Sequence, residues 1–98
     1  MIVKAQCTGH AVTALHVGRE NARRYFAPSS SIIELQLDHL SIECNLPPEF
    51  WRGRPEIRDR RLCAWLEAKQ HDRRSSDAPF TLAMTPAGQN SYRLAKVH

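Results

Sequence analysis

The sequence predicts an α+β domain in which β-hairpins form a small barrel or a curved antiparallel sheet around one main helix, with a second, short helix. Apolar and polar residues alternate in paired stretches separated by short turns, which is typical of hairpins with one buried face. Strands that each bury one face must cover one another, and a small barrel or a strongly curved sheet achieves this. With 98 residues the chain has room for one core, so we expect a single domain over residues 1–98.

The clearest strand pattern lies in residues 32–46. Apolar residues occupy alternate positions as far as Leu37, and the alternation resumes with the opposite phase at Leu40. A two-residue turn at Asp38-His39 explains the change of phase, because it places Leu37 opposite Leu40. The expected hairpin then has one apolar face, formed by Ile33, Leu35, Leu37, Leu40, Ile42 and Cys44.

A second hairpin is expected near the carboxyl end of the chain, with its loop over residues 86–90. Apolar residues alternate before and after this loop. The expected register places Tyr92 opposite Met84 and Leu94 opposite Leu82.

Residues 2–17 are expected to form a third hairpin. Gly9-His10 would be its turn, with glycine supplying the positive φ of a type II′ turn. A helix over residues 11–17 is the alternative interpretation of the same segment.

The main helix is expected over residues 56–70. Its apolar residues follow the i, i+3, i+4 spacing of an amphipathic helix. Pro55 is acceptable at the first position of a helix, and Asp59 would instead be the N-cap if the helix begins later. The apolar stripe consists of Leu62, Trp65 and Leu66.

The short helix is expected over residues 20–26, with Phe26 turned inward. Phe50-Trp51 lies between two segments rich in proline, glycine and arginine that interrupt regular structure. We expect this aromatic pair to fill part of the core.

Composition indicates a cytoplasmic protein with no membrane partner. No apolar run approaches the roughly 20 residues that a membrane helix needs. The first residues lack the apolar segment of a signal peptide. The three cysteines are odd in number and include no C-x-x-C pair, which favours reduced thiols over a disulfide framework.

Arginine dominates the positive charge of the chain. The formal net charge is +4, and eleven of the fourteen basic residues are arginine, which binds phosphate and carboxylate groups in a bidentate manner. One group precedes Tyr25-Phe26 and another follows Trp51, and arginine beside aromatic residues suits a surface that binds nucleic acid. The predicted contact residues are Arg23, Arg24, Arg52, Arg54, Arg58 and Arg61. The competing interpretation is a solvated surface whose arginines pair internally with Glu56, Asp59 and Glu67.

Catalytic and metal-binding patterns are weaker. The expected register of the 32–46 hairpin places Glu34 opposite Glu43, and facing carboxylates could share a proton or bind a cation. Two separate Cys and His pairs could form a zinc tetrad only if they met in space, namely Cys7 with His10 and His39 with Cys44. We therefore predict no catalytic residue, no metal ligand and no cofactor.

Three segments together resemble a pattern found in short bacterial proteins of unassigned function: Phe50-Trp51, residues 55–67 and residues 88–94. The resemblance, which runs from residue 50 to residue 94, covers about half of the chain and implies no functional residue.

The element order is also similar to that of the B3-type pseudobarrels, which bind DNA. It consists of a basic short helix ending at Tyr25-Phe26, the 32–46 hairpin, a second helix and a closing hairpin. This second resemblance is one of fold, and it implies DNA binding through two strand-connecting arms that enter the major groove.

The sequence thus favours a non-enzymatic binding module, most plausibly for nucleic acid. The alternative is a protein-interaction or homo-oligomerisation module. It would pair through an edge strand or dock through the Phe50-Trp51 segment.

Overall fold

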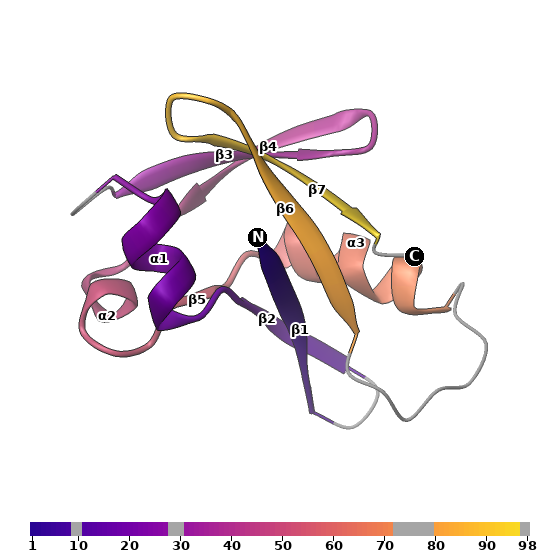
Figure 1. The fold of residues 1–98 in the computed structure, drawn as a ribbon. Coiled ribbons are helices and arrows are strands. Elements are labelled where there is room, and N and C mark those ends of the chain that lie inside the picture. The colour runs from indigo at the N-terminus through magenta and orange to yellow at the C-terminus, as the bar shows by residue number, and fades with distance from the viewer. Residues whose placement is uncertain (9–10, 28–30, 72–79, 97–98) are drawn as a thin grey trace.

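The computed structural model describes residues 1–8, 11–27, 31–71 and 80–96 of the chain. Seven strands form one sheet in the order β4-β3-β7-β6-β1-β2-β5. The sheet curls into a nearly closed barrel, with α1 and α2 together at one end and α3 at the other (Figure 1). The elements are β1 Ile2–Thr8, β2 Ala11–His16, α1 Arg19–Tyr25, β3 Ile32–Leu37, β4 Leu40–Asn45, α2 Pro48–Trp51, β5 Glu56–Ile57, α3 Arg60–His71, β6 Thr81–Gly88 and β7 Ser91–Lys96. The predicted α+β class is confirmed.

The β3–β4 hairpin has the predicted register. Leu37 pairs with Leu40, and the pairing continues through Leu35 with Ile42. Asp38 adopts the left-handed conformation that a tight hairpin turn requires, with φ of 55°. Leu40 departs from the predicted buried face: it is 50% exposed, because it lies at the tip of the hairpin beyond the reach of the core.

The β6–β7 hairpin has a different register from the predicted one. Leu94 pairs with Met84, and Tyr92 pairs with Pro86. The predicted five-residue loop is wrong, because β6 continues through Pro86 to Gly88 and an irregularity in the pairing accommodates the extra residue. Gly88 has φ of 145°. The connection is therefore shorter, and each residue of β7 pairs two positions away from its expected partner.

The sheet also contains a parallel pair, whereas the sequence predicted an antiparallel sheet. β3 and β7 run parallel, with Leu35 opposite Tyr92 and Leu37 opposite Leu94. These strands come from two different hairpins. Their apolar residues share the inner face, and that common burial brings the two hairpins edge to edge.

The hairpin predicted over residues 2–17 is confirmed, since β1 and β2 pair antiparallel. The alternative helix over residues 11–17 is wrong, because β2 occupies Ala11–His16. The predicted turn at Gly9-His10 lies outside the described residues.

The main helix begins later than Pro55. Residues 56 and 57 instead form β5, which pairs with β2 and buries Ile57 completely. Asp59 is the residue that starts α3, since its Oδ1 accepts hydrogen bonds from the backbone N–H groups of Arg61 at 2.8 Å and Leu62 at 3.2 Å. The N-cap alternative is thus confirmed, and the start at Pro55 is wrong.

Helix α3 connects the edge strand β4 with the part of β2 that lies beyond its short pairing with β5. Arg61 donates to the backbone carbonyl of Glu43 on the edge strand β4, at 3.0 Å. Glu67 accepts from the backbone N–H of Val12 on β2, also at 3.0 Å. The side chain of Asp38 receives a hydrogen bond from Trp65 at 3.1 Å and an ion pair from Lys69 at 2.7 Å. Backbone groups that a free sheet edge would expose are therefore bound by helix side chains.

An aromatic cluster joins the two short helices to the sheet. Phe26 stacks on Tyr92 of β7 with ring centroids 4.7 Å apart, and it contacts Phe50 of α2 at 5.3 Å. The Tyr92 hydroxyl donates to the carbonyl of Tyr25 at 2.7 Å. Both Phe26 and Phe50 are buried, as expected from the sequence. Among the described residues, no helix has the length and apolar character that crossing a membrane requires.

We expect replacement of Asp59 by alanine to lower the free energy of unfolding at neutral pH by about 1 kcal/mol, because two N–H groups of α3 lose their acceptor. Burial raises the pKa of Asp59, but hydrogen bonds from the Arg61 side chain and from the backbone of Leu62 and Arg61 together outweigh burial and lower it. A depressed pKa in the folded state gives stability that is present above the unfolded pKa and is lost as the pH falls through the folded pKa.

Urea unfolding of wild type and of D59N from pH 7 to about pH 3 tests this pH dependence. Asparagine still caps a helix, so the advantage of the wild type over D59N should shrink with acidification. A constant difference over the whole range would contradict the assignment.

Candidate nucleic-acid interface

The six predicted arginines do not all line one hollow of the described surface. Arg23 and Arg52 line a pocket between α1 and α2. Arg54 and Arg58 line a second hollow, and Arg61 lies on α3. Arg24 is exposed on α1 and lines neither of these two hollows.

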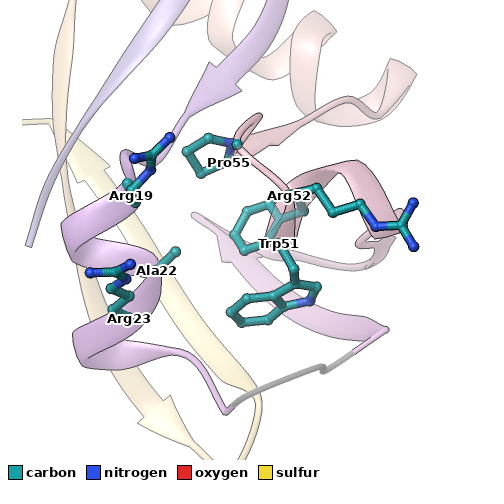
Figure 2. A pocket seen from close by; sticks show the side chains of 8 residues that line it. Arg19, Ala22, Arg23, Trp51, Arg52 and Pro55 are labelled. Atoms are coloured by element: carbon teal, nitrogen blue, oxygen red, sulfur yellow. The ribbon is translucent and has the colours of Figure 1, made fainter.

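The α1–α2 pocket has a volume of about 270 Å³. Figure 2 shows Arg19 and Arg23 on the α1 side and the indole of Trp51 on the α2 side. The full lining consists of Arg19, Ala22, Arg23, Phe50, Trp51, Arg52, Gly53 and Pro55.

Helix geometry explains the α1 wall. Arg19 and Arg23 are four residues apart, so both side chains leave the same face of the helix. Ala22 lies between them and is buried. A Cβ placed on Gly53 would lie 3.7 Å from the Arg19 Nη2, so the guanidinium reaches across to the turn that follows α2. Gly53 has φ of 121°, a conformation that glycine adopts without strain.

Core packing explains the α2 wall. Phe50 is only 2% exposed, and its ring contacts Trp51 in a T-shaped arrangement with centroids 5.0 Å apart. Trp51 itself is partly buried against the core. Arg52 belongs to the lining, but its guanidinium extends away from α1 (Figure 2).

The charged side chains that line the pocket are all positive. Among the described residues, its lining contains three arginines and no carboxylate. Within the part of the chain that the structure describes, none of the ion pairs involves Arg19, Arg23 or Arg52. Guanidinium groups without a protein counter-charge, beside an aromatic ring, favour an anionic ligand with a planar or apolar part.

The second hollow has the opposite character. Arg54 and Arg58 lie with Glu49 and Glu56, so the charges of its lining balance. The Arg58 Nη2 lies 3.1 Å from the Glu56 Oε2. The internal pairing with Glu56 that the competing interpretation proposed is therefore present at Arg58.

The Arg61 side chain also has partners within the fold. Its guanidinium lies 3.4 Å from the Asp59 carboxylate, in addition to its hydrogen bond to Glu43. The structure therefore gives Arg61 a role in joining α3 to β4.

The weaker site hypotheses find little support in the geometry. Glu34 does lie opposite Glu43, but its Oε1 accepts a hydrogen bond from the Ser91 hydroxyl at 2.9 Å. Cys44 is fully buried, and burial raises the pKa of its thiol to about 12, which opposes the thiolate form that binds zinc. His10, the partner of Cys7 in the zinc hypothesis, lies outside the described residues. No group of three metal-binding side chains occurs among the described residues.

Among the arginines that line the pocket, Arg19 is the one that the predicted set of contacts did not include. The helical spacing of Arg19 and Arg23 was a usable signal, because residues four apart share a helix face. The pairing of that face with the segment around Trp51 had no comparable signal. Comparison of the chain with protein-family models, with curated proteins and with solved structures finds no match.

Proposed function

We propose that this protein is a cytoplasmic nucleic-acid-binding module, and that the α1–α2 pocket holds part of the phosphate backbone. The observation that carries the proposal is a lining whose described residues include three arginines and an aromatic wall but no carboxylate. Arginine is weakly hydrated and presents a planar fork that matches phosphate oxygens, so a phosphate can displace its water at low cost.

A polyanion fits this surface better than a single phosphate does. Arg24 lies next to the pocket residue Arg23 on α1, and the Arg52 guanidinium extends outward from the opposite wall. Helix α1 carries three arginines against one acidic residue, Glu20. Positive charge therefore continues from the pocket onto the exposed surface, where successive phosphates of a strand would meet it.

We expect the double variant R19Q/R23Q to bind nucleic acid more weakly than wild type and with a shallower salt dependence. Each lost phosphate contact should reduce the slope of log affinity against log salt by about one. Fluorescence anisotropy with labelled single-stranded and duplex DNA and RNA, at about 50 and about 200 mM salt, measures both quantities.

The matched control is R60Q/R93Q. It removes the same charge from two exposed positions that do not line the pocket. Equal losses in both variants would point to diffuse charge attraction and contradict the pocket as the site. Absence of salt-sensitive binding by the wild type at low salt would overturn nucleic-acid binding itself.

A protein partner or a second copy of the chain is the alternative. Ile32 and Leu40 are 47% and 50% exposed, but they lie at opposite ends of the β3–β4 hairpin and form no continuous apolar patch. The edge of β4 is partly occupied by Arg61, which disfavours pairing with an added strand. Self-association measured by sedimentation, in a protein that binds no nucleic acid, would support this alternative.

A further inference from the structure

We infer that the α1–α2 pocket accepts one unpaired base of a single-stranded nucleic acid, with Trp51 as its stacking surface. Arg19 and Arg23 would then contact the phosphates that flank this base. This inference rests on the proposed function and narrows its ligand to single strands.

The size of the pocket supports a single base. Pockets for drug-sized ligands occupy about 300–1,000 Å³, and this one, at about 270 Å³, lies just below that range. A planar base is small enough for such a space. The two walls come from different helices, and a planar base would lie between them.

The composition of the walls supports a base with its phosphates. Trp51 lies on one wall and the two arginines of α1 on the other (Figure 2). An indole offers a stacking surface to any base, whatever its hydrogen-bonding edge, whereas guanidinium groups bind the backbone. Phe50 holds the indole in a T-shaped contact at 5.0 Å, which reduces the entropy that ordering it on binding would cost.

The geometry of a duplex disfavours its binding at this pocket. Bases within a duplex are stacked on their neighbours, and their faces are closed to a side chain. Reading a major groove needs a protruding helix or ribbon. Helix α1 has seven residues and buries Ala22 against the core, so it does not project from the fold.

The experiment uses W65F as background, because Trp51 is then the single tryptophan of the chain. Two single-stranded probes of about twelve nucleotides are compared, an oligothymidylate and an abasic strand with the same number of phosphates. We expect the oligothymidylate to quench Trp51 fluorescence and to bind about tenfold more tightly than the abasic strand. A uridine oligomer and a duplex of equal length complete the set, and the duplex should bind more weakly than either base-bearing single strand.

Two variants test the role of the ring. W51A should lose the tenfold preference while keeping its affinity for the abasic strand, and W51F should retain most of the preference. Unchanged abasic binding shows that the fold of W51A is intact, and W51F gives a second reading if W51A does not fold.

The outcomes separate the two proposals. Equal affinity for the abasic strand and the oligothymidylate, or duplex binding as tight as single-strand binding, would overturn the stacking site and leave nucleic-acid binding standing. Failure of every probe to bind at low salt would overturn the proposed function together with this inference.

Discussion

Replacing Phe50 by alanine is expected to lower the free energy of unfolding by about 3–5 kcal/mol, a large fraction of the roughly 5–15 kcal/mol that keeps a small domain folded. Phe50 is 2% exposed and contacts Phe26 and Trp51. Alanine would leave a cavity at the point where α1, α2 and the sheet meet. Helix α2 has four residues and no stability of its own, so only this burial keeps it in place.

Urea unfolding followed by circular dichroism measures the loss. F50L is the matched control, because it keeps an apolar side chain and should cost clearly less than F50A. The α2 wall of the pocket should loosen in F50A, so binding should weaken with it. A loss below about 1 kcal/mol would show that the core does not fix α2 in this way.

Replacing Leu66 by alanine is expected to cost about 2–5 kcal/mol. Leu66 is fully buried on the inner face of α3, the helix that connects β4 with β2. The polar contacts of α3 are too weak to compensate for the loss of this buried side chain. The side chains of the Lys69–Asp38 pair are 26% and 52% exposed, and ion pairs that water reaches to this extent contribute about 0–1 kcal/mol.

A68S is the matched control, since Ala68 lies on the exposed face of the same helix. Its effect should stay within a few tenths of a kcal/mol plus the small difference in helix propensity. Thermal and urea unfolding of both variants give the comparison. Similar losses in the two variants would mean that α3 is held by its polar contacts rather than by its apolar stripe.

The sequence indicated some of the residues of the site, but it did not indicate which of them lie together in the fold. The arginines beside Tyr25-Phe26 and after Trp51 were recognisable as two groups. Which arginines line the α1–α2 pocket and which lie beside Glu49 and Glu56 depends on the path of the chain after α2. Arg52 and Arg54 are two residues apart, yet they line different hollows, because the chain reverses direction at Gly53.

The sequence by itself determined the register of the β3–β4 hairpin, whereas the register of the β6–β7 hairpin departs from its prediction. The phase change at Asp38-His39 predicts the β3–β4 register, because a two-residue turn leaves only one register in which the alternating apolar residues of both strands lie on the same face. The inward position of Phe26 and the helical stripe of Leu62 and Leu66 follow from periodicity in the same way.

The tertiary structure decided what depends on segments far apart in the chain. The parallel contact of β3 with β7, the pairing of residues 56–57 with β2 and the meeting of Arg19 with Gly53 have no local signal. Each arises because an apolar face or an unpaired strand edge must be covered, and the element that covers it is chosen by the packing of the whole domain. The candidate binding pocket belongs to this second class, since its two walls come from helices that only the folded core brings together.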